Sequence, residues 1–210
     1  YGPRDLREVR GFVRQICTWL SKHDVKLIVI ACNTATAAGL ALAQMEFDVP
    51  VIGVVEPGAR GAVRMTRNRR VGVIATQATV DSGIYPDTIR NLDAGVTAFS
   101  TATPRFVEIV EDGIRRSNSP IERLTAEASD VYLRPAFQTI ARDYLDPIKK
   151  AGVDTLVLGC THYPVLADGS LEQHSSFYTT GEDLDDFRNI GGHIFGYPID
   201  DLSYVDIKDL

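Results

Sequence analysis

Hydrophobic positions along this chain form two alternating patterns: short unbroken apolar runs, and longer stretches in which apolar residues recur every three or four positions. An unbroken run is typical of a strand buried on both faces of a sheet, and the wider spacing is typical of an amphipathic helix. The expected strands cover residues 27–31, 51–55, 71–75, 96–100, 156–158, 176–179 and 204–207. The expected helices cover residues 5–23, 35–45, 59–65, a stretch from the 76–79 turn through 92, 104–114, 121–150 with a break near Pro135, and 184–194. This alternation predicts α/β layers over largely parallel sheets.

Two of the expected strands end in the same short pattern. The run at 27–31 is followed by Cys32, Asn33 and Thr34, and the run at 156–158 is followed by a glycine, Cys160 and two more polar residues. In parallel sheets, ligands bind beyond the carboxyl ends of the strands. Two such ends can present their thiols to one point from opposite sides, so we expect Cys32 and Cys160 to face a common site.

Composition narrows the classes of function. A chain of 210 residues with a net charge of −6 and a pI near 5.2 lacks the basic character that nucleic-acid binding usually requires. No run approaches the roughly 18 apolar residues of a membrane span, and no signal segment opens the chain. Three cysteines are too few for a disulfide framework, so we expect a cytoplasmic protein. No Gly-rich phosphate-binding motif occurs.

Two opposed thiols suit a reaction that needs a base on one face of a carbon and an acid on the other. Racemisation at an amino-acid α-carbon is such a reaction, since each thiol becomes the conjugate partner of the other after turnover. Asn33, Thr34 and Thr161 lie beside the thiols in sequence and are able to stabilise a carbanion-like transition state.

A simpler interpretation competes for each candidate residue. A strand-end cysteine is most often a buried small hydrophobe, and Cys17, on the apolar stripe of the first helix, is interpreted as packing. His162 is either a core hydrogen-bonding residue or an active group. The cysteines and His162 lack the paired spacing of zinc sites, so we expect no metal.

Several segments resemble the glutamate racemase family, which belongs to the cofactor-independent aspartate/glutamate racemase superfamily. The two family signatures correspond to ACNTA at 31–35 and GCTHYP at 159–164. Further similar segments are Tyr1-Gly2, VIGVVEPGAR at 51–60, FVEIVEDG at 106–113 and FYTTG at 177–181. The similarity covers essentially the whole chain.

The resemblance implies a role for each candidate. Cys32 and Cys160 correspond to the two acid/base thiols, one for each enantiomer. Glu111 corresponds to an acidic residue that assists near one cysteine; its alternative role is that of a solvated helix carboxylate. The positions that correspond to substrate-binding, pocket-edge or thiol-tuning residues are Tyr1, Gly2, Asn33, Thr34, Thr79, Thr161 and His162.

The resemblance also implies an architecture and a physiological role. We expect two similar three-layer α/β domains with mostly parallel sheets, one cysteine on each, and the active site in the cleft between them. The first would comprise 1–56 with 176–210, and the second 57–175. The implied activity is cofactor-independent formation of D-glutamate from L-glutamate for peptidoglycan, without pyridoxal phosphate or metal, by a homodimer.

The sequence departs from the family pattern in two places. Family members open with a strand that carries an Asp-Ser-Gly motif, and they have a longer stretch between Leu166 and Ser175. We expect the printed chain to join pieces of a longer one, because loss of a central strand would expose the interior of a sheet. A chain that ended as written should have little or no racemase activity.

Three other functions remain open at this point. One is a racemase for aspartate or another small acidic substrate, against which the histidine and proline after Cys160 argue. Another is a non-catalytic ligand-binding or regulatory relative. A thiol redox protein is disfavoured because no Cys-x-x-Cys motif occurs.

Overall fold

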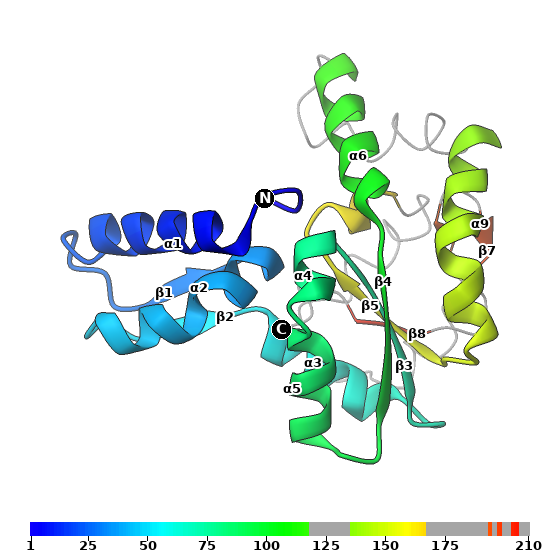
Figure 1. Ribbon diagram of the computed structural model, residues 1–210, viewed down its shortest axis with the longest axis horizontal. Coiled ribbons are helices and arrows are strands. Elements are labelled where there is room, and N and C mark those ends of the chain that lie inside the picture. The colour runs from blue at the N-terminus through cyan, green and yellow to red at the C-terminus, as the bar shows by residue number, and fades with distance from the viewer. Residues whose placement is uncertain (118–134, 167–192, 195–196, 199–202, 206–210) are drawn as a thin grey trace.

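A computed structural model describes residues 1–117, 135–166, 193–194, 197–198 and 203–205. The described elements form two groups, each built on parallel strands (Figure 1). The first group, at the left of the view, contains α1, β1, α2 and β2, and the second contains the remaining elements around a four-stranded sheet. This arrangement confirms the α/β fold class with parallel sheets that the hydrophobic pattern predicts.

The first group packs two helices on a two-stranded sheet. Strands β1 (Ile28–Ile30) and β2 (Val51–Gly53) pair in parallel, with Ile28 opposite Val51. Helices α1 (Leu6–Leu20) and α2 (Asn33–Glu46) cover one face. Their shared core consists of Val9, Val13, Cys17, Ile28, Ile30, Ala35, Ala38, Ala43 and Val51. Cys17 is 2% exposed within this core, which confirms its packing role.

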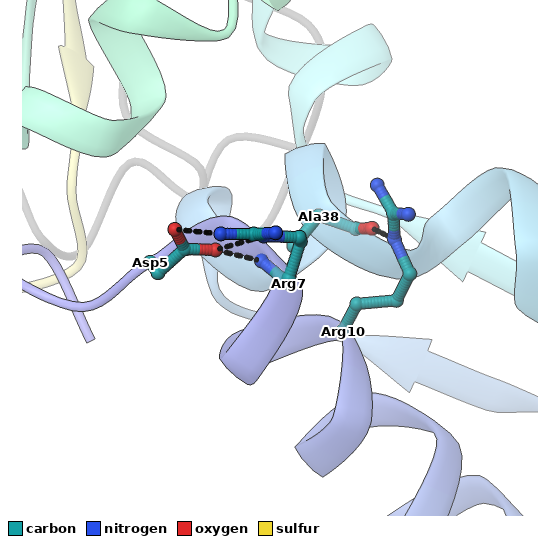
Figure 2. Close-up of polar contacts among 4 residues, drawn as sticks. All are labelled: Asp5, Arg7, Arg10 and Ala38. Carbon is teal, nitrogen blue, oxygen red and sulfur yellow. Dashed lines mark hydrogen bonds and ion pairs between the residues drawn. The ribbon is translucent and has the colours of Figure 1, made fainter.

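Helix α1 is held at its start and along one side by polar contacts (Figure 2). The carboxylate of Asp5 accepts hydrogen bonds from the backbone N–H and the guanidinium of Arg7, which caps the helix N-terminus. One turn later, Nε of Arg10 donates to the carbonyl oxygen of Ala38 at 2.8 Å. This bond ties α1 to α2, so the helix that follows Cys32 is fixed from its outer side.

The second group is a sheet with the strand order β4-β3-β5-β8, all parallel. The strands are β3 (Arg70–Ala75), β4 (Thr97–Ala102), β5 (Thr155–Gly159) and β8 (Ser203–Val205). Ala75 lies opposite Gly159 in the β3–β5 register. The residues that follow them, Thr76 and Cys160, therefore leave the sheet side by side.

Helices cover both faces of this sheet (Figure 1). On one face lie α3 (Val55–Met65) and α5 (Ile84–Leu92), with α4 (Gln77–Asp81) at the end of β3. On the other lie α6 (Pro104–Ser117), α9 (Pro135–Lys150) and the short 3-10 helix η1 (Tyr163–Leu166). Burial on both faces explains why 71–75 and 156–158 are unbroken apolar runs.

Several predicted boundaries differ from those observed. The strand expected at 51–55 ends at Gly53, and the helix expected from residue 59 begins at Val55, four residues earlier. Pro57 is tolerated there because the first N–H groups of a helix have no intrahelical partner. The helix expected through residue 92 is two helices, divided at Gly83, which has a left-handed φ of 68°.

The C-terminal strand belongs to the second sheet. The predicted domain division assigns 176–210 to the first domain, but β8 pairs with β5, with Thr155 opposite Ser203. The edge of β5 that faces away from β3 has free backbone groups, and a parallel strand satisfies them. Strands β6 (His193–Ile194) and β7 (Tyr197–Pro198) form an antiparallel pair, so the expected helix at 184–194 is wrong at its last two residues.

Some predictions lie outside the described residues. These are the helical stretch 121–134, the strand at 176–179, the first part of the helix at 184–194 and the motif at 177–181. In the part of the chain that the structure describes, no helix combines the length and the apolar run that crossing a membrane requires.

Candidate active site

Cys32 stands at the junction between β1 and α2. Its backbone is extended, and its carbonyl oxygen accepts the first helical bond from the N–H of Thr36, so it occupies the N-cap position. The thiol makes no capping hydrogen bond and is half-buried. Asn33 and Thr34 begin the helix and are each 2% exposed. These polar side chains are buried because they point toward the second sheet.

Thr34 enters a ring of three buried hydroxyls. Its Oγ1 lies 2.9 Å from that of Thr76 and 3.1 Å from that of Thr79, and the latter two are 2.9 Å apart. Thr76 caps α4 by accepting from the backbone N–H of Thr79. Each hydroxyl can donate one bond and accept another within the ring. The ring therefore joins the start of α2 to the carboxyl end of β3.

Asn33 makes a second link between the two groups. Oδ1 of Asn33 accepts a hydrogen bond of 2.7 Å from the hydroxyl of Tyr85 on α5. Among the described residues, Nδ2 of Asn33 is buried without a hydrogen-bond partner. A buried amide N–H without a partner is uncommon in folded proteins, and it is available to a bound acceptor.

Cys160 directly follows β5 and is linked to a histidine and a glutamate. Its Sγ lies 3.6 Å from Nδ1 of His162, and Nε2 of His162 lies 2.8 Å from Oε1 of Glu111 on α6. With Glu111 ionised, Nε2 of His162 carries a proton and donates it in the hydrogen bond, which leaves Nδ1 of the neutral ring as an acceptor for the thiol proton. The arrangement can take a proton from Cys160 and return it.

The two thiols differ in burial: Cys32 is half-buried and Cys160 is buried. Burial raises the pKa of the Cys160 thiol from 9.0 to about 11; a backbone hydrogen bond from His162 opposes this shift, and the charge of Cys32 adds to it. Cys160 is 8% exposed. The effect of Cys32 on the pKa of Cys160 links the two strand ends electrostatically. That both thiols face one site stays a prediction.

The other expected site residues are less enclosed. A side-chain carbon on Gly2 would lie 2.8 Å from Cβ and Cγ2 of Thr76, so the backbone of Gly2 passes directly over the threonine ring. Tyr1 is exposed, with its ring 5.9 Å from that of Phe12. Thr161 follows Cys160 and is exposed.

Two residues of the site are absent from the sequence-based set. Thr76 follows β3 in the same way that Cys160 follows β5, so the rule for parallel strand ends was sufficient to find it. Tyr85 carries no such signal, because its position in α5 resembles that of any apolar core residue.

The resulting site combines thiols, hydroxyls and one amide donor. Such a set can move a proton at carbon and bind a carboxylate, since N–H and O–H donors are the usual partners of that group. Within the described ranges, no cluster of three or more His, Cys, Asp or Glu side chains could hold a metal ion.

Comparisons with known proteins give a consistent result. A family model described as Asp/Glu/hydantoin racemase matches residues 2–176. The chain is 43% identical over 166 residues to glutamate racemase from Shouchella clausii. The aligned region covers 79% of this chain and 54% of that protein. The chain therefore spans about half the length of that curated relative.

Solved structures of glutamate racemases are also similar to this chain. Glutamate racemase isoform RacE1 from Bacillus anthracis superimposes with a TM-score of 0.72 at 30% identity, over 100% of this chain and 63% of that one. The Francisella tularensis glutamate racemase in complex with D-glutamate gives a TM-score of 0.63 at 30% identity, over 79% and 56% of the two chains.

Proposed function

The chain belongs to the Asp/Glu/hydantoin racemase family, and on that premise we propose that it interconverts L-glutamate and D-glutamate. The substrate follows from the relatives: the curated protein named above is a glutamate racemase, and the Francisella structure holds D-glutamate. One observation in this chain carries the proposal. Cys32 and Cys160 follow strands of separate sheets, and hydrogen bonds of the neighbours of Cys32, Thr34 with Thr76 and Asn33 with Tyr85, hold these two strand ends together.

In the proposed reaction one proton leaves the α-carbon of glutamate and another is added to it. In one direction the thiolate of Cys32 removes the α-proton, and the thiol of Cys160 donates its own proton from the opposite face. After this turnover Cys32 holds the proton and Cys160 is the thiolate, which is the state that the reverse direction needs. Turnover of the other enantiomer restores the first state. General acid–base transfer of this kind contributes about 10²–10⁴-fold.

His162 and Glu111 are proposed to serve Cys160 alone. Because its pKa is raised, the Cys160 thiol is a weak acid near neutral pH. When Cys160 has to act as the base, Nδ1 of His162 accepts its proton while the Glu111 carboxylate stabilises the imidazolium through Nε2. The pair therefore compensates for burial of the second thiol.

The remaining site residues are proposed to bind substrate. Asn33 and Thr34 at the start of α2, with Thr161 beside Cys160, offer N–H and O–H donors to the carboxylates of glutamate. Thr79 extends this set through the hydroxyl ring, and Gly2 with Tyr1 borders it. Donors placed where negative charge grows stabilise the transition state more than the ground state.

The biological setting is part of the proposal. We propose that the D-glutamate serves peptidoglycan synthesis, that the protein is cytoplasmic, and that it works as a homodimer without a cofactor. The site would lie in a cleft between a first domain, 1–56, and a second, 57–175, with β8 added to the second sheet. The domain division and the site assignments stay predictions.

A racemase for aspartate or another small acidic substrate is the alternative, and a non-catalytic ligand-binding relative is a third. One experiment separates them: the full-length protein is incubated with L-glutamate in D₂O, and α-deuterium incorporation and optical rotation are followed. A glutamate racemase incorporates deuterium and loses rotation. An aspartate enzyme does so only with aspartate, and a binding protein does neither.

A further inference from the structure

Tyr85 occupies a position that connects the two thiol-bearing strand ends. It lies on α5 in the core beneath the second sheet and is 1% exposed. Its hydroxyl leaves this core and donates to Asn33, the residue that follows Cys32. The bond crosses from the second group of elements to the first.

Two glycines leave room for the ring. A side-chain carbon on Gly159, the residue before Cys160, would stand 3.2 Å from Cε2 of Tyr85 and 2.9 Å from the carbonyl oxygen of Ile74. A carbon on Gly58 in α3 would stand 3.3 Å from the Tyr85 hydroxyl. The tyrosine ring therefore contacts the backbone that leads into Cys160, while its hydroxyl contacts the residue after Cys32.

The hydroxyl determines how the Asn33 amide is presented. Because Oδ1 accepts from Tyr85, the carboxamide cannot rotate without losing that bond, and Nδ2 keeps a fixed direction. Nδ2 is the buried amide nitrogen that lacks a partner among the described residues. A buried donor that is held in place and left unpaired is suited to a ligand oxygen, since it needs no reorganisation when charge develops there.

We propose that Tyr85 is a positioning residue for the racemisation proposed above, on which this inference rests. Its hydroxyl holds the Asn33 carboxamide so that Nδ2–H donates to the substrate carboxylate, and its ring sets the Gly159–Cys160 backbone against that amide. Tyr85 itself does not touch the substrate. It acts through Asn33 on one side and through Gly159 on the other.

The test is a double-mutant cycle in the full-length protein, with Tyr85→Phe, Asn33→Ala and the double variant. Tyr85→Phe removes one oxygen and leaves the ring in place. We expect kcat/KM to fall about 10-fold, with most of the loss in kcat, because the donor matters most when charge builds on the carboxylate. We expect kcat/KM to fall by the same factor for L- and D-glutamate. The two enantiomers have equal free energy, so their kcat/KM values must stay equal in any variant.

The cycle separates positioning from general weakening of the core. In the Asn33→Ala background, Tyr85→Phe should cost less than about 2-fold, because its target is already gone. If the two losses multiply fully instead, Tyr85 does not act through Asn33 and the proposal is overturned. Thr155→Val is the matched control: it removes another buried hydroxyl, bonded to Asp154 at the far end of β5, and should leave kcat/KM unchanged.

A second variant covers the case in which Tyr85→Phe does not fold. Gly58→Ala pushes on the Tyr85 hydroxyl without removing it, and alanine favours the helix by its propensity. We expect a melting temperature no lower than that of the wild type together with a kcat/KM reduced about 3-fold. Unchanged kcat/KM in this variant contradicts the proposal. A wild-type protein that fails to racemise glutamate overturns the function itself, which is a different result from a multiplicative cycle.

Discussion

The strand ends after β1 and β5 have nearly the same sequence pattern and very different surroundings. Cys32 is the N-cap of a 14-residue helix, is half-buried, and has a thiol without a capping bond. Cys160 is buried, leads into a short 3-10 helix, and contacts a histidine that is itself bonded to a glutamate. Burial raises the pKa of Cys160 to about 11.

The difference indicates that two thiols in one proposed reaction need not be prepared in the same way. Cys32 has a helix N-terminus beneath it, where unpaired N–H groups favour negative charge. Cys160 is less exposed to solvent, and its proton acceptor is the neighbouring His162. The same proposed function, a thiol that alternates between acid and base, would be supported by backbone N–H groups at Cys32 and by side chains at Cys160.

The largest expected effect comes from removing either thiol. Cys32→Ser and Cys160→Ser should each lower racemisation by at least about 10³-fold, because a serine hydroxyl is a far weaker acid and base near neutral pH. Polarimetry with L- and D-glutamate measures this loss. Cys17→Ala, in the α1 core, serves as the control and should retain activity. Near-normal turnover in either serine variant would contradict the two-thiol assignment.

Breaking the support of Cys160 should have the next largest effect. We expect His162→Asn to lower kcat/KM about 10²-fold and Glu111→Gln about 10-fold, because the imidazole takes the proton and the carboxylate only stabilises its charge. The α-deuterium isotope effect should rise most in the direction in which Cys160 removes the proton.

The control for Glu111→Gln lies on the same helix. Glu108→Gln changes an exposed carboxylate one turn earlier in α6 and should leave both kinetic parameters unchanged. If isotope effects rise equally in both directions, His162 and Glu111 do not act on Cys160 alone, and the asymmetry between the two strand ends is wrong.

The raised pKa of Cys160 makes a separate prediction for stability. The folded protein holds this proton up to about pH 11, whereas an unfolded chain releases it near 9.0, so folding is favoured by the full shift below pH 9. That contribution is lost as pH rises from 9 to 11. Two pH units correspond to about 2.7 kcal/mol, and we expect a loss of about 2 kcal/mol between pH 8 and 10.5.

Chemical denaturation at the two pH values tests this linkage. Subtracting the result for Cys160→Ser removes the contributions of Cys17 and Tyr163, whose pKa values burial also raises. An identical pH dependence in the wild type and the variant would show that the buried thiol titrates normally.

The smallest expected effect concerns the support of the Cys32 end. Oγ1 of Thr36 donates to the carbonyl oxygen of Ile30 at 3.0 Å and accepts from the N–H of Val54, so it joins α2 to the end of β1 and to the residue that follows β2. Thr36→Val should lower the free energy of unfolding by about 1–2 kcal/mol. Urea denaturation measures it, and a loss below about 0.5 kcal/mol would mean that these contacts do not anchor the helix.

Much of the fold followed from the hydrophobic pattern. Unbroken runs such as 71–75 identified strands, because only strands covered on both faces tolerate apolar residues at every position. The boundary at Val55 was missed, since a helix that begins with Val-Glu-Pro and a turn that ends a strand look alike in sequence. The pairing of β8 with β5 was also missed, because strand order depends on edges that lie far apart along the chain.

Some features of the candidate site could also be found from the sequence, and others only from the structure. Residue type and position at a strand end were enough to select Cys32, Cys160 and their polar neighbours, because the chemistry of a thiol and the direction of a parallel strand are local properties. The hydroxyl ring of Thr34, Thr76 and Thr79 and the bond from Tyr85 to Asn33 came only from the tertiary structure. Those contacts join segments more than forty residues apart in sequence, and only packing of the two sheets' helices determines which side chains meet.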